Sequence, residues 1–413
     1  MPQFRKIEVV GLGYIGLPTA AVFADQGVDV VGVDTKADIV DKVNQGKAHF
    51  GEPNLDALVR RVVETKKLRA SLKHEDADAY MIAVPTPLRA GHRADITYVE
   101  AAAAAIAPCL KAGDLVVLES TSPVGTTEKM SAIMAGLRPD LSFPHQKGEL
   151  SDIRVAHCPE RVLPGRILEE VVNNPRIIGG MTRKCAQLAL SLYQIVVKGE
   201  CHVTNARTAE LSKLTENAFR DVNIAFANEL SFICDKFGIN VWELIRLANL
   251  HPRVNVLRPG PGVGGHCIAV DPWFIVDGAP DDAKLIRASR EINDSKPDFV
   301  VRKVQKRASE LRQPVIACLG LAYKADVDDL RESPAVEVVK KLGQSNLGKI
   351  LVVEPHVNKL PHELDSPNLE LADFEVAVKS ANLIVLLVAH RAFMHVDRDM
   401  LKDKFVIDTV GAW

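Results

Sequence analysis

The sequence lacks several features that mark particular classes of protein. Its seven cysteines are an odd number, are scattered along the chain and form no C-x-x-C pair, which argues against a disulfide framework and against structural zinc. No apolar run reaches the ~20 residues that a membrane-spanning helix needs; the longest, at 381–390, predicts a buried strand instead. A net charge of -2 excludes the overall basic surface typical of nucleic-acid-binding proteins. We therefore expect no metal site, no membrane span and no nucleic-acid partner.

The content of apolar and charged residues, by contrast, is ordinary. Hydrophobic residues make up 47% and charged residues 25% of the 413 residues, as is typical of a globular protein. This length exceeds that of one typical core and predicts two or three domains. The strand-like segment KIEVVGLGYIG begins at Lys6 and leaves no room for a cleaved leader, so we expect a cytoplasmic protein.

The N-terminal half alternates short apolar runs with helical stretches. Residues 7–34 predict a strand, a glycine turn, a helix and a second strand, and further apolar runs follow at 79–87 and 114–127. Continuous apolar strands are typical of a parallel sheet that is covered on both faces. We predict a dinucleotide-binding, Rossmann-like domain over residues 1–204.

The rest of the chain predicts a helical region and a second sheet. Residues 205–235 contain neither glycine nor proline and repeat apolar positions at helical spacing, which predicts one long bridging helix. We expect a helical central domain at 205–305 and a smaller Rossmann-like domain at 306–413. Four strand-like runs support the latter, at 315–323, 349–357, 381–390 and 405–410. The predicted fold is α/β, with two doubly wound parallel-sheet domains joined by a helical domain.

The first glycine turn predicts a cofactor site. Gly11, Gly13 and Gly16 form G-x-G-x-x-G between a strand and a helix, and Asp34 ends the next strand. Glycine lets a pyrophosphate approach the helix N-terminus, and a carboxylate accepts hydrogen bonds from the adenosine ribose. The negative charge of Asp34 favours NAD over NADP, although Lys36 lies two residues further on.

A second glycine-rich segment, residues 260–267, ends in a cysteine. The segment GPGVGGHC lets a ligand approach the main chain closely and would set Cys267 at the mouth of a site. A turn followed by an ordinary packed cysteine remains the alternative.

Other polar residues have two interpretations each. Lys213 and Asn217 are four residues apart on the predicted helix and could face one developing oxyanion, but they could also be a solvated pair. Glu160, in the loop CPERVLPG, could be a general base or a salt-bridge partner. Thr121 could hold a water or a substrate hydroxyl, or could simply form a turn.

Six motifs together resemble one known family. In chain order they are VVGLGYIGLPTA, STSPVGTT, CPERVLPG, ELSKLTENAFRDVNIAFANE, GPGVGGHCIAVDP and GLAYKADVDDLRESPA. The chain resembles the UDP-glucose/GDP-mannose dehydrogenase family through these motifs, which cover all three predicted regions. The resemblance implies that a sugar C6 alcohol is oxidised to a carboxylate in two hydride transfers, with two NAD+ and a cysteine that captures the aldehyde.

The resemblance also implies a role for individual residues. Cys267 matches the nucleophile, Lys213 and Asn217 would hold oxyanions, Asp271 would assist proton transfer near the thiol, Thr121 would position water, and Glu160 would serve in thioester hydrolysis. The cofactor-binding residues would be Gly11, Gly13, Tyr14, Ile15, Gly16, Asp34, Pro85, Thr86, Thr121 and Arg331. The substrate-binding residues would be Glu160, Arg161, Val162, Lys213, Asn217, Arg253, Arg258, Gly264, Tyr323, Lys324 and Arg331. The glycines before Cys267 are expected to give the sugar room to reach the sulfur.

The motifs PERVLPGR and GGHCIAVDPWF resemble the branch of this family that acts on N-acetylhexosamine nucleotides. The expected reaction converts UDP-N-acetyl-D-mannosamine to its uronate for surface polysaccharide synthesis, with UDP-N-acetylglucosamine or another UDP-sugar as the alternative substrate. Members commonly form a dimer through the long helix, so we expect at least a homodimer. Two rival functions are a 6-phosphogluconate-type hydroxyacid dehydrogenase, which needs neither the cysteine nor a third domain, and a non-catalytic NAD-binding sensor.

Overall fold

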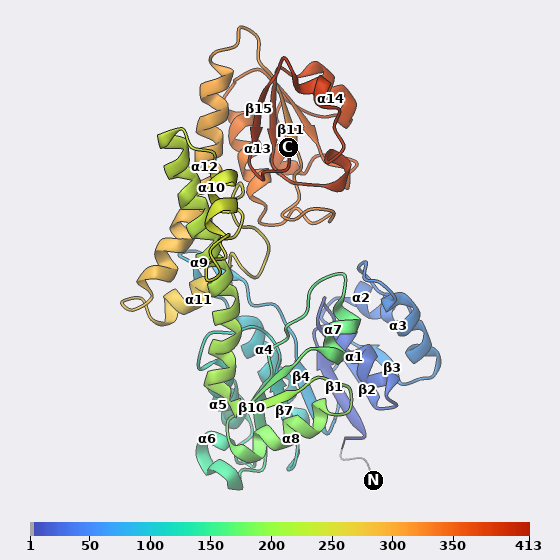
Figure 1. Cartoon of the computed structure of the whole chain (residues 1–413). Helices are drawn as coiled ribbons and strands as arrows, with labels where there is room; N and C mark the ends of the chain where they lie inside the picture. The colour runs from blue at the N-terminus through green and yellow to red at the C-terminus, as the bar shows by residue number, and fades with distance from the viewer. Residues whose placement is uncertain (1–3) are drawn as a thin grey trace. The chain divides into compact units, whose positions relative to one another are not determined.

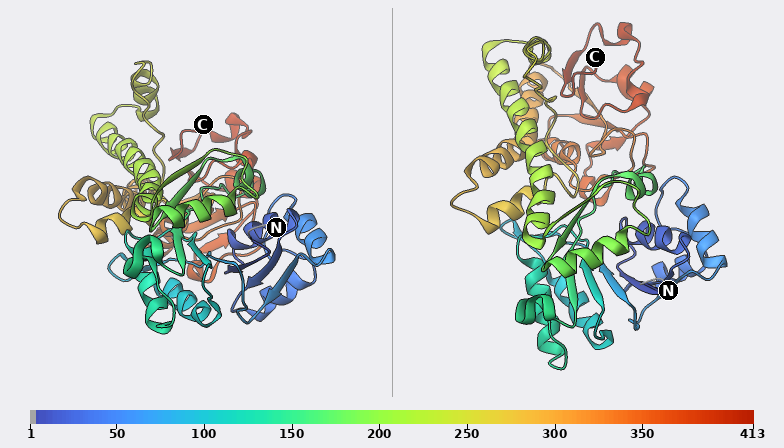
Figure 2. Two further views of the ribbon diagram at one scale, coloured as in Figure 1. Left: turned by 90° about the horizontal axis from the view of Figure 1, so that it is seen from below. Right: turned by 60° about the horizontal axis from the view of Figure 1, so that its bottom comes forward.

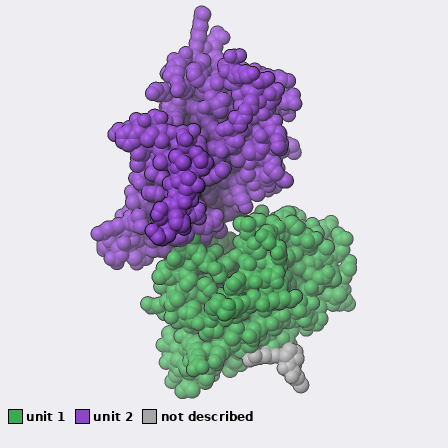
Figure 3. Space-filling model, in the orientation of Figure 1, with its two compact units in different colours: residues 1–216 green, residues 217–413 purple. Residues whose placement is uncertain are grey.

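The computed structural model describes residues 4–413, which fold into two compact units. Unit 1 extends to Glu216, and unit 2 comprises Asn217–Trp413 (Figure 3). Each unit contains one large, mainly or wholly parallel sheet. Within residues 4–413, none of the helices combines the length and apolarity that crossing a membrane requires.

The sheet of unit 1 has the strand order β10-β9-β8-β7-β4-β1-β2-β3 (Figure 1). Its strands are β1 (Lys6–Val10), β2 (Asp29–Val33), β3 (Leu68–Ser71), β4 (Ala79–Ile82), β7 (Leu115–Leu118), β8 (Arg154–His157), β9 (Arg176–Gly180) and β10 (Cys201–Asn205). All neighbours pair in parallel except β8 and β9, which run antiparallel. The expected fold class is confirmed, but this pair makes the first sheet mixed rather than wholly parallel.

Alternate residues of the inner strands pack on opposite faces of this sheet. Ala79 and Met81 of β4 join one apolar core, whereas Tyr80 and Ile82 join the other. Helices cover both faces (Figures 1 and 2); they are α1 (Gly16–Asp25), α2 (Ala37–Asn44), α3 (Leu55–Glu64), α4 (Thr97–Ile106), α5 (Thr126–Leu137), α6 (Pro144–Lys147), α7 (Ile167–Asn173) and α8 (Arg183–Tyr193). A short hairpin pairs β5 (Leu88–Arg89) with β6 (Arg93–Ala94). Burial on both faces explains the continuous apolar runs in the sequence.

The predicted bridging helix is confirmed as α9 (Ala206–Phe237), which ends two residues beyond the predicted end at 235. Unit 2 continues with α10 (Val241–Ala248), α11 (Asp271–Gly278) and α12 (Lys284–Ala308). Buried polar contacts join α9 to α12: Arg290 binds Asp221, with 2.6 Å between Nη1 and Oδ1, and the Nδ2 of Asn228 donates to Asn293 at 2.9 Å. The two helices therefore pack through matched polar groups as well as apolar ones.

The sheet of unit 2 is wholly parallel, with the order β13-β12-β11-β14-β15. Its strands are β11 (Val315–Leu319), β12 (Lys349–Val353), β13 (Leu369–Leu371), β14 (Leu383–Leu386) and β15 (Phe405–Asp408), and its helices are α13 (Pro334–Gln344) and α14 (Phe374–Ser380). All four predicted strands are confirmed. The edge strand β13 was not predicted, because none of its three residues is buried and three are too few for a visible pattern.

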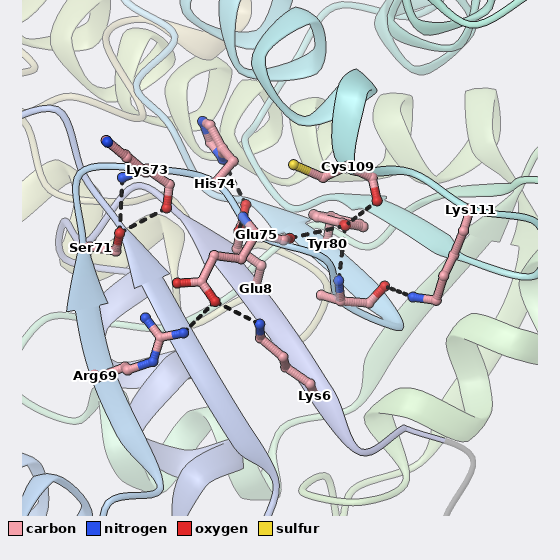
Figure 4. Close-up of polar contacts among 11 residues, drawn as sticks. Lys6, Glu8, Arg69, Ser71, Lys73, His74, Glu75, Tyr80, Cys109 and Lys111 are labelled. Atoms are coloured by element: carbon pink, nitrogen blue, oxygen red, sulfur yellow. Dashed lines mark hydrogen bonds and ion pairs between the residues drawn. The ribbon is translucent and has the colours of Figure 1, made fainter.

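A polar network fastens the segment before β4 to the core of unit 1 (Figure 4). The buried Oε1 of Glu8 lies 2.7 Å from Nδ1 of His74, and its Oε2 accepts from the backbone of Glu75. The hydroxyl of Tyr80 accepts from the backbone N–H of Ala77 at 3.0 Å and lies within 3.1 Å of the carbonyl oxygens of Glu75 and Cys109. The network satisfies polar groups that the packing has removed from water.

We predict that Tyr80→Phe destabilises the protein. The substitution keeps the ring but takes the hydroxyl partner from the buried N–H of Ala77 and from a partly buried carbonyl, which costs about 1–3 kcal/mol. The midpoint of thermal unfolding should fall by several degrees, as measured by calorimetry. Tyr98→Phe is the matched control, because the Tyr98 ring is exposed. The unfolding midpoint of this variant should equal that of the wild type. Equal midpoints for Tyr80→Phe and the wild type would contradict a stabilising role of the hydroxyl.

Candidate active site

The glycine turn between β1 and α1 has the geometry of a dinucleotide site. Gly11 has φ +92°, and a Cβ there would lie 2.7 Å from the carbonyl oxygen of Ala83. A Cβ on Gly16 would lie 1.8 Å from the carbonyl oxygen of Gly11. A side chain at either position would clash with the protein's own backbone, so both residues must be glycine. A Cβ on Gly13, however, would meet nothing within 4 Å among residues 4–413, so this position is open at the helix N-terminus, where a pyrophosphate would bind.

Asp34 lies directly beside this turn. Its Oδ2 accepts from the backbone N–H of Leu12 at 2.9 Å, and its Oδ1 accepts from that of Lys36 at the same distance. The carboxylate is only half-buried, so its remaining lone pairs can accept from ribose hydroxyls. Tyr14 is exposed, and its ring centroid lies 4.3 Å from that of Phe50. Ile15 directly precedes α1. The residues of unit 1 therefore fit NAD at this turn.

The threonines predicted near the nicotinamide lie together at the carboxyl ends of two paired strands. β4 pairs with β7, so the segments that follow them are neighbours. The hydroxyl of Thr86 donates to the carbonyl oxygen of Thr121 at 2.6 Å, while the preceding Pro85 is exposed. This is the edge of a doubly wound sheet at which ligands bind.

Glu160 follows β8 and is buried in an ion pair. Its Oε2 accepts from Nη1 of Arg176 at 2.5 Å, and its Oε1 accepts from the backbone N–H of Arg161 at 2.7 Å. The salt-bridge interpretation is thus confirmed, and it does not exclude a role as a base, because both interactions fix the carboxylate in one orientation. The side chain of Arg161 binds Glu216 at 2.7 Å, and Val162 packs partly buried against the core of unit 1.

Three residues of this cluster were missed by sequence reasoning: Arg176, Glu119 and Tyr193. Arg176 also donates through Nη2 to Oε1 of Glu119 at 2.7 Å, and the hydroxyl of Tyr193 donates to the same oxygen at 2.6 Å. Burial raises the pKa of Glu119 to about 7, against the opposing effect of Arg176. The one available signal was a glutamate at the end of the apolar run of β7, directly before STSP.

Lys213 and Asn217 lie one turn apart on α9, as predicted. Lys213 is half-buried and forms no ion pair with any residue of 4–413. Asn217 is buried, and its Nδ2 donates to Oδ2 of Asp271 at 2.6 Å. Asp271, the first residue of α11, donates its backbone N–H to the carbonyl oxygen of Cys267 at 2.8 Å. Asn217 and Asp271, which were predicted as separate site residues, are therefore hydrogen-bonded to each other, and Asp271 is also bonded to the backbone of Cys267.

Cys267 is exposed, as a nucleophile must be. At two of the glycines before it, the missing side chain makes room for the protein itself. A Cβ on Gly264 would lie 2.5 Å from the carbonyl oxygen of Glu332. Gly265 has φ +84°, and a Cβ there would lie 3.0 Å from the ring of Tyr323. The loop therefore packs closely against the segment that follows β11.

That segment carries the other predicted residues of unit 2. Arg331 donates through Nε and Nη2 to the carboxylate of Asp329, at 2.8 Å in each case. Nε2 of His266 lies 3.6 Å from Oδ2 of the same aspartate. Lys324 is exposed. The GGHC loop thus packs against the segment 320–335, with Gly265 at the ring of Tyr323 and His266 near Asp329.

Arg253 and Arg258 flank the glycine-rich loop, and their side chains are accessible. Neither is buried, and neither forms an ion pair with residues 4–413. Their guanidinium groups are available to a diphosphate, which is well matched to arginine.

One cluster in unit 2 has the composition of a metal site. Possible ligand atoms of Asp326, His356 and His390 lie within 4.8 Å of one another. However, Nδ1 of His390 accepts from the backbone N–H of Asp326 at 3.0 Å, and its Nε2 lies 3.1 Å from Oε2 of Glu354. Both ring nitrogens are therefore engaged within the protein.

Comparison with known proteins identifies the family. Models of the UDP-glucose/GDP-mannose dehydrogenase family match residues 5–197 (NAD binding domain), 207–295 (central domain) and 317–413 (UDP binding domain). The chain is 61% identical to an NDP-N-acetyl-D-galactosaminuronic acid dehydrogenase of Ralstonia nicotianae, over 100% of this chain and 97% of that protein. It is 58% identical to a UDP-N-acetyl-D-mannosamine dehydrogenase of Campylobacter jejuni, over 97% and 98% respectively.

The fold agrees with this assignment. The structure of a UDP-D-ManNAc dehydrogenase from Pyrococcus horikoshii superposes with a TM-score of 0.87 at 39% identity, and the match covers 99% of this chain and 96% of that one. The chain belongs to the UDP-glucose/GDP-mannose dehydrogenase family and is an NAD-dependent oxidoreductase with a UDP-binding domain.

Proposed function

We propose that the chain oxidises the C6 alcohol of UDP-N-acetyl-D-mannosamine to a carboxylate through a covalent intermediate on Cys267. The observation that carries this proposal is the linkage in which Asp271 binds the side chain of Asn217 and the main chain of Cys267. A packed structural cysteine is typically buried, whereas Cys267 is exposed. NAD would bind within residues 1–204, the cysteine loop belongs to 205–305, and the UDP group would bind within 306–413.

The proposed mechanism assigns each step to a residue. NAD held at the glycine turn of Gly11, Gly13 and Gly16 would supply the hydride acceptor for the two oxidations. Lys213 and Asn217 stabilise the negative charge that develops on the C6 oxygen. The thiolate of Cys267 adds to the aldehyde carbon, because an aldehyde donates hydride readily only after a nucleophile has added. Loss of the second hydride leaves a thioester on the sulfur, and Asp271 assists proton transfer near the thiol.

Hydrolysis then releases the product. Water positioned by Thr121 attacks the acyl carbon, and Glu160 accepts one proton of that water. The C–S bond breaks, and its electron pair returns to the sulfur of Cys267. In sum, the alcohol and one water yield a carboxylate, two hydrides and three protons.

Substrate-binding residues are proposed in each unit. In unit 2, Arg253 and Arg258 would bind the diphosphate, because they are accessible and carry no ion pair with residues 4–413. Further contacts to the nucleotide sugar are proposed for Arg161, Val162, Gly264, Tyr323, Lys324 and Arg331. Arg331 is also proposed to contact the cofactor.

A second candidate substrate is the N-acetyl-D-galactosamine nucleotide, because the relative from Ralstonia nicotianae is 61% identical to this chain. UDP-N-acetylglucosamine is the third. A panel of these three UDP-sugars with NAD+ separates them: we expect the highest kcat/KM for UDP-N-acetyl-D-mannosamine, by at least tenfold. A higher kcat/KM for the galactosamine sugar would transfer the assignment to it, and no turnover of any sugar would favour the NAD-binding sensor.

We predict that Cys267→Ser abolishes the second oxidation. A hydroxyl is almost never ionised near neutral pH and cannot replace a thiolate as the nucleophile. Uronate formation should fall by orders of magnitude, whereas NAD+ affinity in calorimetry should barely change. Cys201→Ser is the matched control, since Cys201 is half-buried on the edge strand of unit 1, and it should retain wild-type turnover. Near-normal uronate production by Cys267→Ser would contradict the covalent mechanism.

We also propose that two copies of the chain associate through α9. Phe219, Phe226, Ile233 and Phe237 are exposed on this helix at spacings of seven, seven and four residues, which places them along one face. A continuous apolar stripe of this kind is typical of an interface. Light scattering should give twice the chain mass of 45.1 kDa, and Phe226→Glu should give the single mass. A monomeric wild-type protein would contradict this proposal.

A further inference from the structure

Behind Glu160 lies a buried cluster contributed by four separate elements of unit 1. Glu119 follows β7, Glu160 follows β8, Arg176 begins β9 and Tyr193 ends α8. None of the four side chains is more than 7% exposed. The guanidinium of Arg176 bridges the two carboxylates, with 2.5 Å to Glu160 and 2.7 Å to Glu119, and lies 4.3 Å over the ring of Tyr193.

The charges in this cluster do not balance. One guanidinium faces two carboxylates, and a buried net charge is costly. Two buried atoms have no hydrogen-bond partner within residues 4–413: Oε2 of Glu119 and Nε of Arg176. An extra proton on Glu119 would neutralise the cluster, and Oε2 is the atom that is free of other hydrogen bonds. Burial, which raises the pKa of Glu119 to about 7, agrees with this assignment.

The other titratable groups that face the cluster remain neutral near pH 7. Burial raises the pKa of the thiols of Cys158 and Cys201 and that of the Tyr193 hydroxyl. Arg176 remains charged, because the two carboxylates raise its pKa even though burial opposes this. Glu119 is therefore the member of the cluster that loses its proton as the pH rises through about 7.

Glu160 is sensitive to this proton through Arg176. Its carboxylate has two donors, the backbone N–H of Arg161 and Nη1 of Arg176. When Glu119 is neutral, the charge of Arg176 acts mainly on Glu160. When Glu119 is ionised, the guanidinium is shared between two carboxylates, so the positive charge that faces Glu160 is partly offset.

We propose that Arg176 is the positioning residue of Glu160, and that protonation of Glu119 controls how readily Glu160 takes a proton from the hydrolytic water. This inference rests on the proposed role of Glu160 in thioester hydrolysis. In that step the water oxygen bonds to the acyl carbon, the water proton passes to Glu160, and the C–S electron pair returns to Cys267. No oxidant or reductant takes part.

The proton on Glu119 also affects the stability of the fold. Because the pKa of Glu119 is raised in the folded state, its neutral form stabilises the fold below the unfolded value of about 4.5, and this contribution is lost as pH rises through about 7. Glu119→Gln is isosteric and stays neutral. As the pH rises from 5 to 8, the thermal midpoint of this variant should rise relative to that of the wild type. The same unfolding measurement shows whether the variant folds.

The decisive experiment measures thioester hydrolysis in a single turnover between pH 6 and 8.5. The covalent adduct on Cys267 is quantified by intact mass after rapid quenching. In the wild type the hydrolysis rate should rise several-fold across about pH 7, whereas in Glu119→Gln it should stay near the wild-type rate at low pH throughout. Arg176→Lys should slow hydrolysis at least tenfold at every pH without reducing the formation of the adduct.

Two controls make the result specific. Asp114→Asn neutralises a buried carboxylate at the opposite end of the same strand β7 and should keep the wild-type pH profile. Tyr193→Phe removes a hydrogen bond that lowers the pKa of Glu119, so the midpoint of the profile should move to higher pH; this variant serves if Glu119→Gln does not fold.

The outcomes separate this inference from the proposed function. Glu160→Gln should accumulate the adduct. If it does not, the role of Glu160 is wrong, and the inference falls with it. If Glu160→Gln accumulates the adduct but Glu119→Gln retains the wild-type pH dependence, only the inference is wrong.

Discussion

The proposed catalytic arrangement around Cys267 depends on one buried hydrogen bond, that from Nδ2 of Asn217 to Oδ2 of Asp271. Both side chains are withdrawn from water, so removing either would leave the other without this partner in a poorly solvated site. Asp271 begins α11, and its backbone binds the carbonyl of Cys267. The bond therefore ties the position of the cysteine loop to the long helix α9, on which Lys213 and Asn217 are held one turn apart.

Glycine has two distinct roles in this chain. Gly13 faces open space at the start of α1, whereas Gly264 and Gly265 are in close contact with the segment after β11. In the first case the absence of a side chain leaves room for a ligand; in the second it lets two parts of unit 2 pack together. The second arrangement brings Tyr323 against Gly265, two residues before the proposed nucleophile Cys267.

Local features were predictable from the sequence, whereas pairings between distant segments were not. The turn at Gly11–Gly16 and the position of Asp34 follow from residues close together in the chain, and α9 follows from about thirty residues without a helix breaker. The ion pair of Glu160 with Arg176 was not predictable, because it requires β8 and β9 to lie side by side in antiparallel order. No local pattern in the sequence encodes that order. The antiparallel pair of β8 and β9 is the point at which the sheet differs from the predicted parallel topology.

The most direct test of the four-electron mechanism is the number of NADH formed per sugar. A limiting amount of UDP-N-acetyl-D-mannosamine is oxidised to completion with excess NAD+, and NADH is measured by absorbance while a hydrazine reagent traps any free aldehyde. The account predicts two NADH per sugar and no trapped aldehyde, because the intermediate stays on Cys267 between the oxidations. One NADH per sugar with release of an aldehyde or a ketone would contradict it.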